Sequence, residues 1–324
     1  MATSGVWSIQ KVYNKQVSGQ WVSTPYVPPL GPLYGFFSGG YVSAAYSSTV
    51  QRIVYSADTN TAGVRGPLSA ARRALSATGN ASYGWFGGGY SATFFSTVDR
   101  IDYAADTNTA GVRGPLTGLR AFQAASGNES YGWFGGGYIF PSAAKVTTVD
   151  RIDYAADTAT ASVRAPLTLA RVQFAATGNP TYTWYGGGIT TAAVSTVDRI
   201  TASTDTVTAS TRGSLSLARR SHAASGSNDY GWYICGVSSA ATSVIDRIDY
   251  ITDTATASVR GASVVSIAAH SATGDTSYGW YGTNSPGGTV YYRIDYLADT
   301  NISTTRGYFI NNPYLTAATG GYPG

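Results

Sequence analysis

Few side chains in this sequence could perform acid–base, nucleophilic or metal chemistry. His222 and His270 are the only histidines, and Cys235 and Glu129 are the only cysteine and glutamate. No Ser-His-Asp set, phosphate-binding loop or metal-ligand spacing accompanies them. We therefore expect both histidines to be packed or surface side chains, and we expect neither an enzyme nor a bound metal or cofactor.

The arginines and aspartates, by contrast, recur in a fixed register. An aspartate follows each marker arginine after six residues, and a second arginine lies seven residues further on, as Asp106 and Arg113 do after Arg100. The markers are 46 to 51 residues apart, which is typical of an array of supersecondary units. They lie in the sequence DRIDY or its equivalent, at Arg52, Arg100, Arg151, Arg199, Arg247 and Arg293.

Two interpretations of this charge pattern are open. An arginine can donate two parallel hydrogen bonds to a carboxylate, so the series could join each unit to the next through structural pairs. Alternatively, a ring of guanidinium groups could line a central channel and bind an anion. Recurrence in every copy favours the structural pairs, because a scaffold must repeat whereas a binding site need not. Each turn supplies one carboxylate, far fewer oxygens than Ca²⁺ requires, which argues against metal sites.

One unit is typical of four short strands. Residues 72–78 are small and apolar, residues 82–88 are aromatic, residues 96–103 are β-branched or aromatic at several positions, and residues 109–113 precede Gly-Pro. Gly79-Asn80 and Asp106 to Asn108 mark turns. Four strands in each unit predict the blade of an all-β propeller. A tryptophan recurs in the second strand, as at Trp85; we expect it in the core, and the alternative is exposed stacking on sugars.

The first copy lacks its first strand, because only a Pro-rich stretch precedes Tyr34. Similar sequence stands at the other end of the chain, where Leu315 to Gly320 (LTAATG) resembles Leu75 to Gly79 (LSATG). We therefore predict a six-bladed propeller of four-stranded blades over residues 31–324. A C-terminal strand would complete the first blade, close the ring and remove open edges. Residues 1–30 would form a separate N-terminal anchoring tail.

The repeated unit resembles the kelch repeat. Arg72 before the first strand, Gly87 and Gly88 closing the second, Tyr103 in the third and the Asp106-Thr107 turn after it stand where that family has its markers. The resemblance covers residues 31 to about 320 and implies a kelch-like β-propeller. It departs at the fourth strand, where the family usually has a Trp and this chain has a small residue in each copy, such as Ala110.

The loop after the second strand differs in every copy and is the first candidate for recognition. The six loops span residues 42–47, 91–95, 139–147, 189–194, 237–243 and 284–288. Because they join the same neighbouring strands, they should lie on one face. Variable loops on a rigid scaffold commonly carry recognition, and the alternative is sequence drift without a ligand. The candidate outer-loop recognition residues are Tyr46, Phe94, Phe95, Phe140 and Lys145.

The tail is the second candidate. It has many large side chains for a segment without a core of its own, whereas disordered tails usually lack aromatic residues. We predict that it docks on another subunit or on its own propeller. The predicted docking residues are Trp7, Ile9, Tyr13, Trp21 and Tyr26.

Composition argues against several partners. Charged residues make up 12% of the chain, the net charge is +4, and the excess forms no basic stripe, so we expect no nucleic acid. Met1 to Leu30 lacks an apolar stretch of signal-peptide length, and no run in the chain approaches a membrane span. A single cysteine excludes an intramolecular disulfide. We expect synthesis in a cytoplasm and no membrane insertion.

The repeat text resembles that of kelch-like repeat proteins encoded by marine bacteriophages. The shared segments are SGVWSIQKVYNKQVSGQW near the N-terminus, and TVDRIDYA and DTNTA in the units. The resemblance implies a non-enzymatic virion structural protein (a tail fibre, an adhesin or a head decoration) that is made in the host cytoplasm. Its tail would bind other virion proteins, and one propeller face would be available to a host-surface glycan or protein. The alternative is a free lectin-like or protein-binding propeller that is not associated with a virion.

Overall fold

The computed structural model describes residues 34–57, 61–266, 268–283, 289–298, 304–310 and 316–320. Within these ranges the chain is all-β, and its regular structure consists of strands and one-turn 3-10 helices. The predicted tail, residues 1–30, and the sixth loop, residues 284–288, lie outside the described residues. None of the helices in the described ranges has the length and apolar character needed to cross a membrane.

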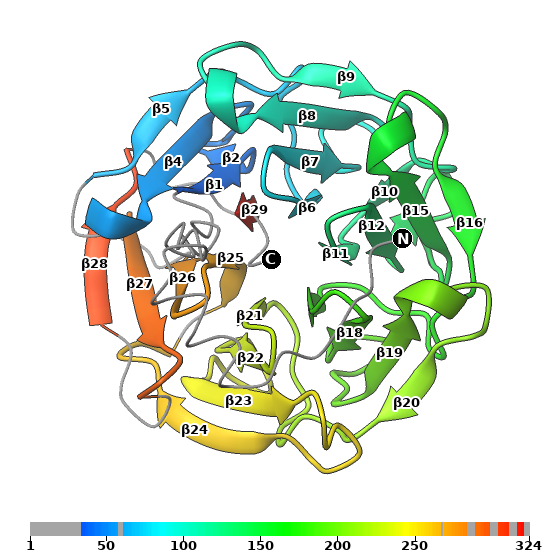
Figure 1. Ribbon diagram of the computed structural model, residues 1–324, viewed down its shortest axis with the longest axis vertical. Helices are drawn as coiled ribbons and strands as arrows, with labels where there is room; N and C mark the ends of the chain where they lie inside the picture. Colours follow the sequence, from blue (N-terminus) through cyan, green and yellow to red (C-terminus); the bar gives the residue numbers. More distant parts are fainter. Residues whose placement is uncertain are drawn as a thin grey trace, which may run out of the picture. The chain divides into compact units, whose positions relative to one another are not determined.

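Most described strands belong to six four-stranded antiparallel sheets, which follow one another around a common centre in a propeller-like arrangement (Figure 1). We number the sheets 1 to 6 in chain order. Sheet 2 shows the pattern: β6 (Ser76–Gly79) is innermost, and β7 (Tyr83–Gly87), β8 (Val98–Asp102) and β9 (Gly111–Arg113) follow outward.

The other five sheets have the same order from the centre outward. Sheet 1 contains β29 (Ala317–Gly320), β1 (Tyr34–Ser38), β4 (Val50–Val54) and β5 (Gly63–Arg65). Sheet 3 contains β11 (Ala124–Gly127), β12 (Tyr131–Gly135), β15 (Val149–Asp153) and β16 (Ser162–Arg164). Sheet 4 contains β17 (Ala175–Gly178), β18 (Tyr182–Gly186), β19 (Val197–Thr201) and β20 (Ser210–Arg212). Sheet 5 contains β21 (Ala223–Gly226), β22 (Tyr230–Ile234), β23 (Val244–Asp249) and β24 (Ser258–Ala262). Sheet 6 contains β25 (Ala269–Gly274), β26 (Tyr278–Thr283), β27 (Val290–Asp295) and β28 (Thr304–Tyr308).

The two ends of the described chain meet in sheet 1. β29 pairs antiparallel with β1, with Gly320 opposite Gly35 and Ala317 opposite Ser38. The C-terminal strand therefore supplies the innermost position that the N-terminal side lacks, as the sequence predicted. β29 also lies beside β6 of sheet 2 and β25 of sheet 6.

The strands are shorter than the sequence predicted. Residues 96–103 favoured a strand, but β8 ends at Asp102, whose side chain accepts a hydrogen bond from the Ala104 amide at 2.9 Å. That bond caps the 3-10 turn η2 (Tyr103–Ala105), so a local side-chain contact replaces strand pairing. Three turns occupy the same place in sheets 1, 3 and 4: η1 (Tyr55–Ala57), η3 (Tyr154–Ala156) and η4 (Ala202–Thr204).

Neighbouring sheets pack through the large aromatic residue of the second strand. Trp85 is fully buried and stacks on Tyr154 of sheet 3, with ring centroids 3.8 Å apart. The Tyr154 hydroxyl lies 2.9 Å from Thr78 Oγ1, back in sheet 2. Trp280 of sheet 6 stacks in the same way on Tyr55 of sheet 1, with centroids 4.1 Å apart. The prediction that the tryptophan series forms core is confirmed.

The turn aspartate is the polar centre of the same contact. Asp157 of sheet 3 accepts hydrogen bonds from Trp85 Nε1 at 2.9 Å and from Arg100 Nη1 at 3.0 Å. Arg113 Nε lies 3.3 Å from the same oxygen, and all three donors belong to sheet 2. Asp205 and Asp253 receive the equivalent tryptophan and arginines of the preceding sheet. Four marker arginines, Arg52, Arg100, Arg151 and Arg199, therefore join neighbouring sheets, as the structural interpretation predicted.

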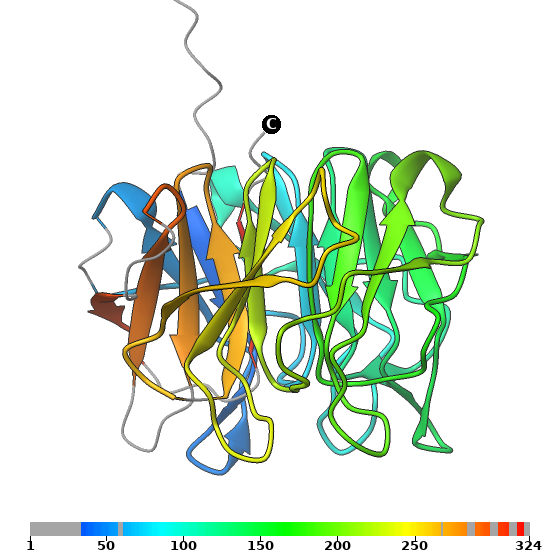
Figure 2. The same cartoon turned by 90° about the horizontal axis from the view of Figure 1, so that it is seen from below.

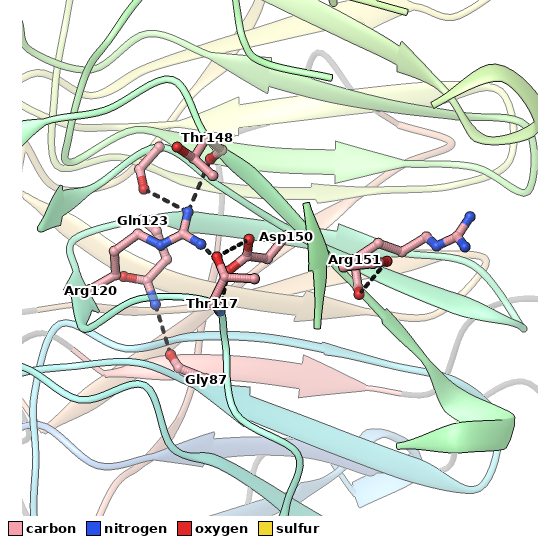
Figure 3. Close-up of polar contacts among 9 residues, drawn as sticks. Gly87, Thr117, Arg120, Gln123, Thr148, Asp150 and Arg151 are labelled. Carbon is pink, nitrogen blue, oxygen red and sulfur yellow. Dashed lines mark hydrogen bonds and ion pairs between the residues drawn. The ribbon is translucent and has the colours of Figure 1, made fainter. Parts of the chain in front are cut away.

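A second set of ion pairs joins the segment before an innermost strand to the third strand of the same four-stranded sheet. Arg120 pairs with Asp150 and donates to the Thr148 carbonyl at 3.0 Å, while Thr117 Oγ1 donates to Asp150 at 2.7 Å (Figure 3). Both charged side chains are buried, and a buried carboxylate is tolerated only when paired and hydrogen-bonded. Equivalent pairs, each 3.1 Å long, are Arg72–Asp99, Arg171–Asp198 and Arg219–Asp246.

We expect Asp157→Ala to lower the free energy of unfolding by about 3–5 kcal/mol, because two arginines and a buried indole N–H lose their acceptor. Asp102→Ala is the control; it removes one exposed capping bond and should cost about 1 kcal/mol. Urea unfolding followed by tryptophan fluorescence measures both variants. Equal losses would mean that the Asp157 carboxylate does not hold the sheets together.

Candidate functional site

The central cavity is the first place where a site could lie. It comprises two spaces of about 80 and 120 Å³, both lined mainly by small residues of the innermost strands, such as Ala77, Ala125 and Ala176. No arginine is among its described lining residues, because the arginines before β6, β11, β17 and β21 are buried in ion pairs. The alternative of a guanidinium-lined channel is therefore wrong for the described part of the chain. The space suits a few waters rather than a large ligand.

The His222 side chain lines this cavity, but it is buried and packed against its neighbours. Its side chain is 3% exposed, and Nε2 lies 3.0 Å from the Gly186 carbonyl of sheet 4. Burial, followed by the charge of Arg219, lowers the pKa of His222 to about 3, and the Gly186 bond opposes this only in part. Gln123, which precedes the innermost strand of sheet 3, makes the equivalent bond to sheet 2, from Nε2 to the Gly87 carbonyl at 2.8 Å (Figure 3). His222 is thus a neutral structural residue, as expected. The side chain of His270 lies outside the described residues.

The loops after the second strands emerge together from one edge of the sheets, at the bottom of Figure 2. We call this the loop face. The first loop forms a hairpin of β2 (Tyr41–Val42) and β3 (Ala45–Tyr46). The third forms a small sheet of β10 (Arg120–Ala121), β13 (Tyr138–Ile139) and β14 (Ala144–Lys145). For the five described loops, the prediction of a shared face is confirmed.

Five aromatic side chains form a continuous line across the loops of sheets 1, 2 and 3. We call it the aromatic row. Its ring centroids are 5.2 Å apart for Tyr41–Tyr46, 5.8 Å for Tyr46–Tyr90, 5.6 Å for Tyr90–Phe94 and 6.1 Å for Phe94–Phe140, all edge-to-face. The first four are half-buried, and Phe140 is 50% exposed. Because each ring touches the next, three loops present one surface.

One cation, Arg73, lies against the aromatic row, and a second, Lys145, lies nearby in the loop that carries Phe140. The Arg73 guanidinium lies 5.0 Å from the Tyr41 ring centroid, 5.8 Å from Tyr46 and 5.5 Å from Tyr90. Lys145 Nζ lies 5.6 Å from the centroid of Tyr138, in the third loop. Desolvation, and then the hydrogen bond to Tyr90, raise the pKa of Tyr46, while Arg73 lowers it; Tyr46 is therefore a neutral hydroxyl at physiological pH.

The structure brings together three of the five predicted loop residues, Tyr46, Phe94 and Phe140. Lys145 lies in the same loop as Phe140, beside Tyr138. Phe95 has a different environment: its backbone pairs with Arg120, and its ring centroid lies 5.6 Å from the buried Arg72 guanidinium. The predicted tail residues Trp7, Ile9, Tyr13, Trp21 and Tyr26 lie outside the described residues.

Sequence reasoning missed Arg73, Tyr41 and Tyr90. A signal was present in the residue that follows the glycine run of each copy. It is tyrosine in the first three copies, at Tyr41, Tyr90 and Tyr138, but aliphatic in the next two, at Ile189 and Val237. A scaffold role would favour the same kind of residue in all copies. The change in the fourth copy therefore distinguishes the loops of sheets 1 to 3, which have the tyrosine, from those of sheets 4 and 5, which do not.

The backbone under the aromatic row is the same where the row is absent. Tyr90 bridges to Phe94 in the loop of sheet 2, and sheets 4 and 5 build the same bridge with small aliphatic pairs, Ile189–Ala193 and Val237–Ala241. Folding of the loop therefore does not require aromatic rings. The loop backbone does not require the rings, although Tyr90 and Phe94 also pack against the buried Ala74 and Ala121. The aromatic row is therefore a candidate binding surface in the described part of the chain.

This surface offers ring faces, tyrosine hydroxyls and cations. Among the described residues, no three His, Cys, Asp or Glu side chains are grouped where they could hold a metal ion. No protein-family model matches the chain, and no curated protein is significantly similar to it.

Replacing Tyr90 by Ile and Phe94 by Ala together should leave the fold intact, because sheet 4 already has Ile189 and Ala193 at these positions. We expect the free energy of unfolding to fall by about 1–2 kcal/mol, because both rings are half-buried and pack against Ala74 and Ala121. Circular dichroism and urea unfolding measure this. A loss of several kcal/mol would show that the fold depends on these rings, and it would argue against a separate role for them in binding.

His222 predicts a specific acid sensitivity. Its pKa is lower in the folded state than the usual 6.5, so the unfolded state binds a proton first. Its contribution to stability is complete above pH 6.5 and is lost as the pH falls towards 3. His222→Gln, which introduces the side chain that Gln123 has at the equivalent place, should remove this loss. Between pH 7.5 and 4.5, urea unfolding should show the original chain losing about 2–3 kcal/mol more than the variant. Parallel losses would mean that His222 titrates normally.

Proposed function

We propose that residues 31–324 form a six-bladed, kelch-like β-propeller in which each four-stranded sheet is one blade. β29 would complete the first blade and close the ring. Supporting this, the described residues hold six such sheets, and β29 is paired with β1 and adjacent to both β6 and β25. The kelch-like markers also fit: Arg72 precedes β6, Gly87 ends β7, and Asp106 follows β8 and η2.

We further propose a non-enzymatic recognition protein of a bacteriophage virion, with the loop face turned towards the host surface. The observation that carries the recognition role is the aromatic row, whose rings the loop backbone does not need. Recognition surfaces are enriched in tyrosine and arginine because these side chains offer large contact area at little entropic cost. The virion role is supported by the resemblance of the repeat text to that of phage-encoded proteins, and the aromatic tail would supply the anchor.

A free lectin-like or protein-binding propeller is the second candidate. The aromatic row would serve such a protein equally well, because the rings act in the same way on or off a particle. The two candidates differ in what they require of residues 1–30. A virion protein needs them for incorporation, whereas a free propeller does not.

Deleting residues 1–30 from the phage copy of this chain should remove the protein from purified particles, since the proposed anchor is lost. Immunoblotting of gradient-purified particles measures incorporation. Particles carrying Tyr90→Ile with Phe94→Ala are the matched comparison; they should keep the protein but adsorb to host cells at least about tenfold more slowly, as expected for loss of a hot-spot pair.

Two results would contradict this proposal. Normal incorporation of the tail-deleted chain would reject the anchor and favour the free propeller. Normal adsorption of the double variant would reject the loop face as the host-binding surface.

A further inference from the structure

Charge is segregated between the two edges of the sheets. No aspartate or glutamate occurs in the described segments that form the loop face, residues 39–49, 68–75, 88–97, 117–123, 136–148, 168–174, 187–196, 216–222, 235–243 and 263–266. The described acids without an arginine partner lie in turns or at strand ends on the opposite edge: Asp102, Glu129, Asp153, Asp229, Asp249, Asp275 and Asp295. The loop face therefore has no negative charge of its own except the inner carboxylates buried in ion pairs.

Three cations of the loop face are not neutralised by an acid of the described residues. Arg73 contacts only tyrosine rings, and Lys145 lies over Tyr138. Arg220 donates to the neutral Gln173 Oε1 at 3.1 Å. Other arginines here, such as Arg72 and Arg120, are buried against aspartates. Arg73 thus lies against the aromatic row, Lys145 lies in the same loop as Phe140, and Arg220 lies on sheet 5.

Arg73 is held ready for an anion. Three tyrosine rings surround its guanidinium at 5.0 to 5.8 Å, which restrains a side chain that would otherwise lose much rotamer entropy on binding. A guanidinium pairs with a carboxylate or sulfate through two parallel hydrogen bonds. The tyrosine hydroxyls beside it can donate and accept hydrogen bonds.

We propose that the aromatic row binds an acidic saccharide, with sugar rings packed on its aromatic side chains and a carboxylate or sulfate group on Arg73. Lys145 would bind a second anionic group further along the saccharide. This inference rests on the proposed recognition role of the loop face and specifies its ligand class. We commit to a saccharide rather than a protein because most exposed residues around the row are small, such as Ser43, Ala44, Ala92 and Ala143. Leu119, whose carbonyl accepts a hydrogen bond from the Phe140 amide, is the large apolar exception. Few cations and no basic stripe argue against a nucleic acid.

The test is direct binding of the purified full chain to three polysaccharides. Polygalacturonate carries carboxylates, dextran sulfate carries sulfates, and dextran is neutral. At 50 mM NaCl, calorimetry should show binding to one or both acidic polymers and at least tenfold weaker binding to dextran, because charge-assisted hydrogen bonds contribute roughly a factor of ten. Raising NaCl to 300 mM should weaken the complexes with the acidic polymers. The acidic polymer that binds identifies the anionic group.

Single substitutions locate the site. Arg73→Gln should weaken binding of the acidic polymer about tenfold and Lys145→Gln several-fold, because each removes one charged contact. Arg220→Gln is the matched control: Arg220 pairs with Val237 as Arg73 pairs with Tyr90, but it lies outside the aromatic row. It should change affinity by less than about twofold. Thermal unfolding of each variant confirms the fold.

Several outcomes would overturn the inference. Equal losses for Arg73→Gln and Arg220→Gln would indicate diffuse charge attraction rather than a site. Dextran binding as tight as that of the acidic polymers would reject the acidic class while leaving the recognition role in place. Displacement of the polymer by lower concentrations of a single-stranded oligothymidylate would identify a nucleic-acid surface. Failure of all three polymers, with slow adsorption of the Tyr90→Ile, Phe94→Ala particles, would indicate a protein receptor. Failure of all three with normal adsorption would reject the proposed function itself.

Discussion

A buried carboxylate shared between neighbouring sheets is the interaction on which this architecture depends. Asp157 accepts hydrogen bonds from the Trp85 indole and Arg100 and lies beside Arg113, so one acid fixes three side chains of the preceding sheet. The Tyr154 ring stacks on Trp85 in the same contact. Because removal of any partner leaves a charge or donor unpaired in the interior, the angle between sheets is strongly specified. Among the described residues the same junction joins sheets 3 and 4 and sheets 4 and 5, and the Asp106 junction between sheets 1 and 2 has the two arginines without a tryptophan.

The junction determines where variation is tolerated. The inner pair Arg120–Asp150 anchors the segment before β11 to the third strand, and the junction aspartates fix the turns at the other edge. The loops after the second strands contribute to neither of these contacts. Their sequence can vary, since Tyr90 and Ile189 occupy equivalent β-bridges. Recognition chemistry could therefore accumulate on one edge without loss of the fold. The absence of acids from that edge and their presence on the other give the two edges different electrostatic character.

Much of the architecture could be predicted from sequence because the repeat displays its own constraints. The invariant spacing of Arg100 and Asp106 required a structural explanation, and similar sequence at Leu75 and Leu315 indicated where β29 would pair. Strand ends were less accurate, because capping by Asp102 competes with pairing. The binding surface was only partly predictable. Phe94 and Phe140 could be recognised as variable aromatics, but their contact with each other, and the place of Arg73 among three tyrosines, depend on how separate loops are brought together in space.

The central claim is that a repeated scaffold presents one edge for recognition. If the proposed virion role holds, a cryo-EM map of that particle tests this claim most directly. We predict that residues 1–30 are ordered against another virion protein and that the aromatic row, from Tyr41 to Phe140, faces outward with no virion protein over it. A map in which the aromatic row is buried against the particle, and the acidic edge faces the solvent, would contradict the claim.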